Sequence, residues 1–163
     1  MGRVSAKIWQ GAGKSAGRNA ERLLQYVQRS LGSEHRFRDA DDFGAWAKDL
    51  GLPVVDPERC EAFHGCGTPD NLRSICSTGF RNGSALCQRG SAVYTTPEPG
   101  PAARYYGFSV VVGGRPHRLV IGVSFSRGPK DYLHHGFGDG PFVYFCADAS
   151  SVRPEGVVLV PVA

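Results

Sequence analysis

From Pro53 onward, glycines and prolines divide the chain into short runs rich in β-forming residues, and this pattern limits the folds that the chain can adopt. Between these runs lie two short stretches of helical character, one that opens at Pro69 and ends at Gly79, and one with Pro101 in its first turn. Short strands interrupted by short helices predict an α+β fold. The expected strands are residues 62–65, 92–95, 108–112, 118–125, 142–145 and 156–160, and the expected helices are residues 69–79 and 101–106.

The sequence before Pro53 has a different, helical periodicity. Residues 16–31 carry leucine and valine at spacings of three and four, which predicts a helix with one apolar stripe. Residues 41–50 predict a second short helix with Trp46 as a core anchor. We therefore expect a helical N-terminal extension over residues 1–56 and a strand-rich domain over residues 57–163. The stripe of the first helix is expected to pack either on this domain or on another chain of a larger assembly.

Composition favours an ordinary globular domain. The chain has 163 residues, of which 41% are hydrophobic and 21% are charged, so it can bury a sizeable core. No apolar run approaches the roughly 20 residues of a membrane-spanning helix, so we expect a soluble protein with no membrane partner. The formal charge of +4 permits phosphate-bearing partners without requiring them.

The cysteines and the N-terminus bear on location. Five cysteines at wide spacings predict free thiols and an intracellular protein, cytoplasmic or nuclear. The first 20 residues hold four basic side chains and no acidic one, which suits an organelle-targeting segment or a flexible, partner-binding arm. His64 lies between Cys60 and Cys66, but no CxxC pair accompanies it, so we expect no metal site.

Several motifs follow one another in a specific order. Residues 62–65 read Ala-Phe-His-Gly, and a helical stretch ending in Gly79-Phe80 follows. Residues 90–96 read Gly-Ser-Ala-Val-Tyr-Thr-Thr, residues 102–105 read Ala-Ala-Arg-Tyr, and residues 152–155 read Val-Arg-Pro-Glu ahead of an apolar run. Taken singly, a His-Gly pair is most often a turn, and Tyr94 and Tyr105 are readily explained as core aromatics.

As an ordered set, these motifs resemble the catalytic domain of the poly(ADP-ribose) polymerase-like ADP-ribosyltransferases over residues 60–160. The resemblance implies a two-sheet, split-β fold with a cleft that binds NAD as a substrate. It also implies the roles of individual residues. His64 would donate to the adenosine ribose, the backbone of Gly65 would approach the nicotinamide amide, Tyr105 would stack on the nicotinamide, and Tyr94 would line the same pocket.

The sequence departs from the family pattern at three places. Cys66 follows Gly65 where the family usually has a hydroxyl residue, and Ala102 replaces a serine that bonds the nicotinamide amide. The polymerase members also carry a catalytic glutamate at the start of a late strand. Val143 or Pro141 falls nearest that position here, and Asp139 is the only acid nearby.

Two functions remain open at this point. The first is NAD-dependent mono-ADP-ribosyl transfer, or NAD glycohydrolysis, onto an unknown protein or nucleic-acid acceptor, with Asp139, Glu98 or the acceptor supplying the base. The second is a noncatalytic module that keeps the fold as a binding or structural subunit. The pair His134-His135 with Asp131 suggests a metal site or a base. It falls in a glycine-rich stretch between strands, residues 129–141, which favours a surface loop, or a lining for the acceptor side of the pocket.

Overall fold

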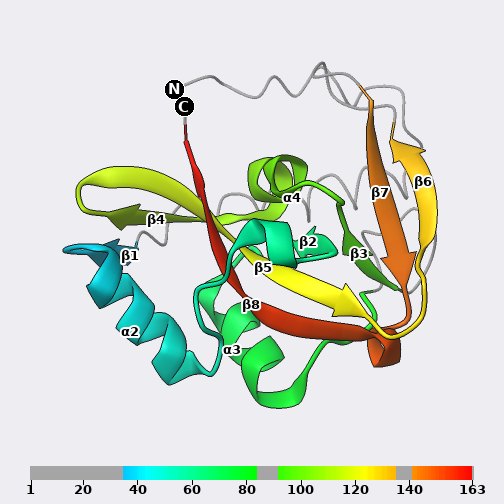
Figure 1. Cartoon of the computed structure of the whole chain (residues 1–163), viewed down its shortest axis with the longest axis horizontal. Helices are drawn as coiled ribbons and strands as arrows, with labels where there is room; N and C mark the ends of the chain where they lie inside the picture. The colour runs from blue at the N-terminus through cyan, green and yellow to red at the C-terminus, as the bar shows by residue number, and fades with distance from the viewer. Residues whose placement is uncertain (1–34, 84–91, 135–140, 163) are drawn as a thin grey trace, which may run out of the picture.

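The computed structural model describes residues 35–83, 92–134 and 141–162, which form two β-sheets and three α-helices (Figure 1). The expected helix over residues 16–31 lies outside these ranges. In chain order the elements are β1 (His35–Phe37), α2 (Ala40–Leu50), the 3-10 helix η2 (Pro57–Arg59), β2 (Ala62–His64), α3 (Pro69–Thr78), β3 (Val93–Thr95), α4 (Pro99–Tyr106), β4 (Phe108–Val112), β5 (Arg115–Phe125), β6 (Lys130–His134), β7 (Phe142–Ala147), the 3-10 helix η3 (Ala149–Ser151) and β8 (Val152–Pro161).

The larger sheet has five strands and is built around the long strand β5. It runs in the order β1-β4-β5-β2, and β8 also pairs with β5. The β1–β4 pairing is parallel and the other pairings are antiparallel. Strands β4 and β5 form a hairpin whose two-residue loop is Gly113-Gly114, with φ angles of 58° and 77°. Two consecutive positive φ angles are what a tight hairpin turn requires, and glycine adopts them without strain.

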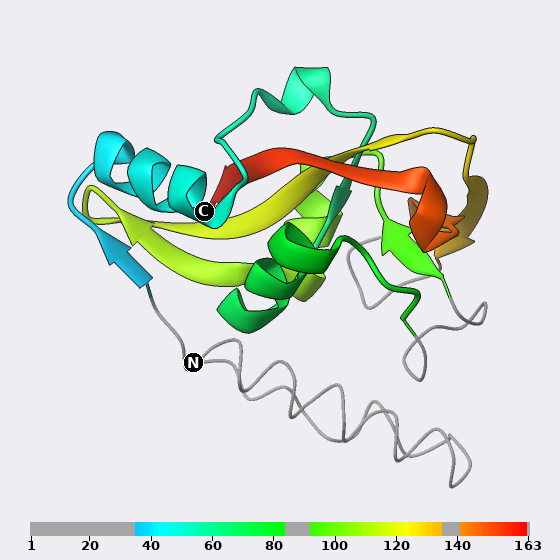
Figure 2. The same ribbon diagram turned by 90° about the horizontal axis from the view of Figure 1, so that it is seen from below.

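The smaller sheet has three strands in the order β3-β7-β6, all antiparallel. In two views at right angles it lies at the opposite end of the molecule from β1 and α2 (Figures 1 and 2). The two sheets meet where β2 runs beside β3. There, Phe63 and Thr96 exchange two backbone hydrogen bonds of 2.8 and 2.9 Å. This junction brings His64, at the end of β2, next to β3.

Successive residues of a strand point to opposite faces of a sheet. In the larger sheet, apolar side chains lie on both faces. On one face Ile121 packs in a core with Phe43 of α2 and Leu72 of α3. On the other face Val120 packs with Ala102 of α4 in a second cluster. The sheet is therefore covered on both sides, and α4 is held against the face opposite to α2 and α3.

The predicted α+β fold with two sheets is confirmed. The helix predicted from Pro69 is present, and Thr68 is its N-cap, with a hydroxyl that accepts from the Asn71 N–H at 3.1 Å. Helix α4 begins two residues before its predicted start, at Pro99, and β8 begins four residues before its predicted start, at Val152. None of the helices in the described ranges is long and apolar enough to span a membrane.

Two expectations need correction. Part of the stretch predicted as a surface loop forms strand β6, because Tyr132 and His134 pair in register with Tyr144 and Phe142 of β7. In addition, residues 35–56 are not separate from the strand-rich domain. Strand β1 belongs to the larger sheet, Phe43 is 1% exposed within the main core, and the segment that leads into η2 hydrogen-bonds to β8.

Candidate functional site

His64 is held against the backbone of β3. Its Nδ1 lies 2.8 Å from the carbonyl oxygen of Tyr94, and because a carbonyl can only accept, Nδ1 carries the proton and donates. Desolvation lowers the pKa of His64, and this hydrogen bond opposes the shift only in part, so the ring is neutral at pH 7. Nε2 therefore holds a lone pair. This corrects the role expected from the sequence: toward a ribose hydroxyl, Nε2 would accept a hydrogen bond rather than donate one.

Phe80 fixes the plane of this imidazole. The two ring centroids are 5.1 Å apart, and the planes are nearly perpendicular at 83°. Phe80 follows Gly79, which caps the C-terminal end of α3 as the Gly-Phe pair predicts. The residue directly after this cap therefore supplies the aromatic ring that packs against His64. His64 is thus oriented from two sides, by the backbone of β3 and by the residue after α3.

Gly65 lies against α4, and a larger residue would not fit. A Cβ at this position would lie 2.3 Å from the Cβ of Tyr106 and 2.7 Å from the carbonyl oxygen of Ala102. Its φ is not positive, so the need for glycine is steric and not conformational. From the sequence, we expect glycine here because a ligand approaches the backbone closely. In the structure, glycine is needed because helix α4 approaches the backbone closely.

Helix α4 carries Ala102 and Tyr105 on neighbouring turns. Ala102 is 3% exposed and packs in the cluster that covers the larger sheet, so its side chain is part of the core. Tyr105 is half-buried and reaches the smaller sheet, where its ring stacks on Phe142 with centroids 5.4 Å apart and planes 22° apart. The helix therefore links the two sheets, with Ala102 packed on the larger one and Tyr105 on the smaller one.

The smaller sheet presents one strongly aromatic surface, which we call the aromatic face. Cross-strand register and the alternation of side chains place its members on one side of the sheet. They are Tyr94 of β3, Tyr132 and His134 of β6, and Phe142 and Tyr144 of β7, joined by Tyr105 of α4. The ring centroids are 5.9 Å apart for Tyr94 and Tyr144, 5.6 Å for Tyr132 and Tyr144, 6.2 Å for His134 and Tyr144, and 4.8 Å for His134 and Phe142. An unbroken series of ring contacts thus connects Tyr105 to Tyr94.

The three residues on which the resemblance depends are brought together only in part. His64 contacts Tyr94 through the backbone carbonyl, whereas the Tyr94 ring packs on Tyr144 of the aromatic face. Tyr105 reaches the same face through Phe142. The site is therefore a junction at which β2, β3 and α4 meet the edge of the aromatic face.

Val143 does not join this group. It pairs with Leu133 on the opposite side of the sheet, where their exposed fractions are 38% and 51%. Its side chain therefore points away from Tyr94, and the late strand does not direct this position into the site. Asp139 lies outside the described residues. Glu98 stands at the N-cap position of α4, where its backbone carbonyl accepts from the Thr96 hydroxyl at 2.6 Å.

Cys66 is buried in the main core rather than exposed at the site. Desolvation raises the pKa of its thiol to about 12, so the nucleophilic thiolate is absent at neutral pH. Its carbonyl accepts from the Asn71 side-chain amide at 2.8 Å and from the Thr68 N–H at 2.9 Å, which ties the chain after Gly65 to the start of α3. The described ranges contain no group of three or more His, Cys, Asp or Glu side chains that could hold a metal ion.

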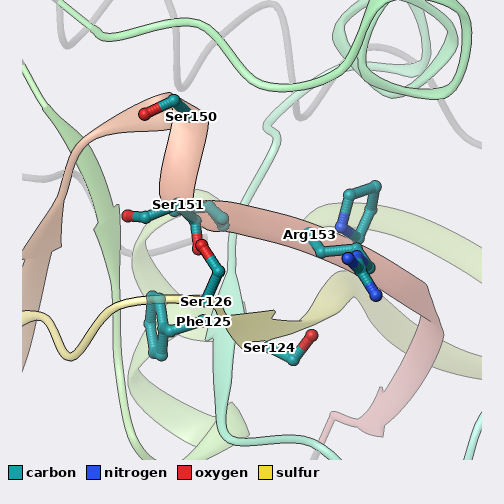
Figure 3. Close-up of a pocket in the computed structure, with 8 residues that line it drawn as sticks. Ser124, Phe125, Ser126, Ser150, Ser151 and Arg153 are labelled. Carbon is teal, nitrogen blue, oxygen red and sulfur yellow. The ribbon is translucent and has the colours of Figure 1, made fainter.

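A pocket of about 260 Å³ lies away from this junction, where the end of β5, η3 and the start of β8 meet (Figure 3). Its lining is Ser124, Phe125, Ser126, Ser150, Ser151, Val152, Arg153 and Pro154, and none of the residues expected to bind NAD is among them. The hydroxyl groups serve the fold: that of Ser150 donates to Asp148 at 2.6 Å, and that of Ser124 donates to Glu155. We therefore place the candidate site at the junction of the sheets and not in this pocket.

Comparisons of the chain with protein-family models, with curated proteins and with solved structures yield no match. Sequence reasoning missed most of the aromatic face. The signal for it is the alternation Tyr132-x-His134 and Phe142-x-Tyr144, which is the pattern of two strands that share a face.

Proposed function

We propose that this chain binds NAD at the junction of its two sheets and transfers a single ADP-ribose to a protein or nucleic-acid acceptor, or to water. One observation carries the proposal: a neutral, oriented His64 lies against the backbone of Tyr94, and α4 places Tyr105 beside the same small sheet. His64, Tyr94 and Tyr105 are the residues of the motifs that resemble those of the ADP-ribosyltransferases.

The chemistry assigned to these residues is binding and orientation. Nε2 of His64 accepts a hydrogen bond from a ribose hydroxyl, and the Tyr105 ring stacks on the nicotinamide. In the reaction, the bond between the ribose C1′ and the nicotinamide nitrogen breaks, and its electron pair leaves with neutral nicotinamide. The acceptor oxygen forms the new bond to C1′ and releases one proton. Holding NAD and acceptor together supplies the rate advantage of proximity.

Single transfer is favoured over polymer formation because the aromatic face has no carboxylate on its described strands. Besides the aromatic residues, β6 and β7 contribute Lys130 and Cys146 to it. Chain extension needs a base at the hydroxyl of an ADP-ribose that is already attached, and Val143 faces the other way. Loss of one positioned acid–base group typically costs about 10²- to 10⁴-fold in rate.

A second candidate, a noncatalytic binding module, is favoured by the position of Phe142. This ring already covers one face of Tyr105, the side chain that would stack on nicotinamide. A chain that has filled its own stacking surface would keep the fold and lose the substrate. The two candidates thus differ in whether NAD reaches Tyr105.

The test is incubation of the full chain with NAD labelled in the adenylate, with nicotinamide release measured and the products separated on a gel. We expect slow nicotinamide release and products that carry one ADP-ribose, or free ADP-ribose in the absence of an acceptor. A ladder of long polymers would refute single transfer. No nicotinamide release with any protein or nucleic-acid acceptor would leave the binding module as the function.

A further inference from the structure

We infer that Asn82 is a positioning residue for His64, an inference that rests on the proposed function. Asn82 lies two residues after Phe80, in the segment that follows the Gly79 cap of α3. Its side-chain amide ties this segment to η3, the turn between β7 and β8. The Phe80 ring, which packs against the imidazole of His64, is therefore carried by a segment with a fixed anchor.

The anchor uses both polar atoms of the Asn82 amide. Its Oδ1 accepts from the backbone N–H of Ala149 at 2.8 Å, and its Nδ2 donates to a carboxylate oxygen of Asp148 at 3.2 Å. Because a backbone N–H can only donate, the contact with Ala149 fixes which way the amide points. Asp148 is the N-cap of η3, and its other carboxylate oxygen accepts from the N–H and the hydroxyl of Ser150 at 3.0 and 2.6 Å.

The charge of Asp148 strengthens this anchor. Hydrogen bonds from Ser150, and then the one from Asn82, lower the pKa of the Asp148 carboxyl to about 2. The carboxylate is therefore ionised at neutral pH, and hydrogen bonds to an ionised group are stronger than those between neutral groups.

The two groups that hold His64 are attached to the same stretch of chain. Tyr94, whose carbonyl accepts from Nδ1 of His64, lies on β3, and β3 pairs with the last residues of β7. Asn82 binds the two residues that directly follow β7. The hydrogen-bonding strand and the Phe80 segment are thus fixed relative to one another, and His64 lies between them.

This arrangement matters because the hydrogen bond through Nδ1 fixes only one atom of the imidazole. The plane of the ring is set by the contact with Phe80, at a centroid distance of 5.1 Å and an angle of 83°. The lone pair of Nε2 lies in the ring plane, so its direction toward a ribose hydroxyl follows that plane. Asn82 acts on the substrate only through His64, by holding the segment that carries Phe80.

The test uses three changes at the anchor in the full chain. Asn82→Ala removes both hydrogen bonds, and Asn82→Asp places a second carboxylate against that of Asp148. Combining Asn82→Asp with Asp148→Asn exchanges the two side chains and restores a donor facing an acceptor. Ser77→Ala is the control, because it removes an exposed hydrogen bond of 3.2 Å to the Ser74 carbonyl within α3.

Three quantities are measured for each protein: the NMR signals of the His64 ring, the NAD dissociation constant and the free energy of unfolding in urea. The ring signals are identified by their absence in His64→Gln. We expect both single changes at Asn82 to shift these signals, since the ring current of Phe80 acts on them, and to weaken NAD binding about 3- to 10-fold. The exchanged pair and Ser77→Ala should keep the natural ring signals and bind NAD within about twofold of the natural chain.

Unchanged His64 signals in the folded Asn82 variants would overturn the positioning role, even where the free energy of unfolding falls. Failure of the exchanged pair to restore the signals would overturn the part assigned to Asp148. A natural chain that binds no NAD would overturn the proposed function, while the ring signals still decide whether Asn82 orients His64.

Discussion

At the scale of single residues, the candidate site contains a histidine that is held neutral inside the fold. His64 donates through Nδ1 to the backbone of Tyr94, and burial lowers its pKa. His35 is a second histidine with a lowered pKa, first through desolvation and then through the positive charge of Arg73. Its ring lies among aromatic rings at the start of the described chain, 5.5 Å from Trp46. Both rings resist protonation in the folded state.

This predicts that stability falls as the pH is lowered below about 6.5, the ordinary pKa of histidine. Between that value and the lower folded pKa values, the unfolded chain binds more protons than the folded one, so acid favours unfolding. The free energy of unfolding should fall by at most about 1.4 kcal/mol per pH unit for each histidine. Urea unfolding at pH 7.5, 6.5 and 5.5 measures this slope. His64→Gln should reduce this slope, and equal slopes in the natural chain and in His64→Gln would contradict the account.

Gly65 gives a second prediction at this scale. In Gly65→Ala the new methyl group would meet the Cβ of Tyr106 and the Ala102 carbonyl, so α4 must shift. We expect a loss of about 1–3 kcal/mol of stability, as for other overpacked sites. Gly44→Ala is the matched control, because Gly44 lies inside α2 with nothing within 4 Å of the new methyl group. That variant should gain up to about 1 kcal/mol. Chemical denaturation of both variants checks this, and equal stability changes would refute the close contact.

At the scale of elements, the alternation of side chains along strand β7 determines which of them face the site. Phe142 and Tyr144 point to the aromatic face, whereas Val143 points to the other side with Leu133. A substitution that follows the sequence pattern of the polymerases would therefore put its carboxylate on the wrong side of the sheet.

We accordingly predict that Val143→Glu leaves the rate of NAD turnover within about twofold and yields no polymer. Because Val143 is 38% exposed, the change in stability should stay within about 1 kcal/mol. Nicotinamide release and product length on a gel are the readouts, with urea unfolding to verify the fold. A tenfold gain in rate, or chains of several ADP-ribose units, would show that this position does face the substrate.

Much of the element pattern could be predicted from the sequence, because its signals are local. Strand β4 has the predicted bounds, and α3 ends at the predicted Gly79. Strand β6 was missed because glycines and prolines flank it, and only its pairing with β7 identifies Lys130–His134 as a strand. The reason for Gly65 is likewise nonlocal, since it depends on a helix that begins more than thirty residues later.

At the scale of the whole molecule, the described N-terminal elements are part of one core with the strands that carry the site. Strand β1 extends the larger sheet through its parallel pairing with β4. Phe43 and Ala47 of α2 are 1% and 0% exposed in the core that also contains Ile121. Residues 35–56 are therefore needed for the stability of the domain, and not only as an extension.

We predict that a chain that begins at Pro57 does not fold cooperatively. Removal of one buried phenylalanine side chain alone typically costs about 3–5 kcal/mol, against a total stability of about 5–15 kcal/mol for a domain. The truncation also removes Ala47, Leu52 and strand β1. Thermal unfolding followed by circular dichroism measures the outcome. A sigmoidal transition within about 5 °C of that of the full chain would contradict the shared core.

The central claim is that NAD binds at the junction of the two sheets, and calorimetric titration of the full chain with NAD tests it most directly. Tyr105→Ala removes the proposed stacking ring, while Tyr106→Ala, at the next residue of α4, removes a ring that is 41% exposed and keeps the Cβ beside Gly65. We predict one binding site per chain in the natural protein, at least tenfold weaker binding in Tyr105→Ala, and binding within about twofold in Tyr106→Ala. Absence of binding in the natural protein, or equal affinity in the natural protein and Tyr105→Ala, would contradict the account.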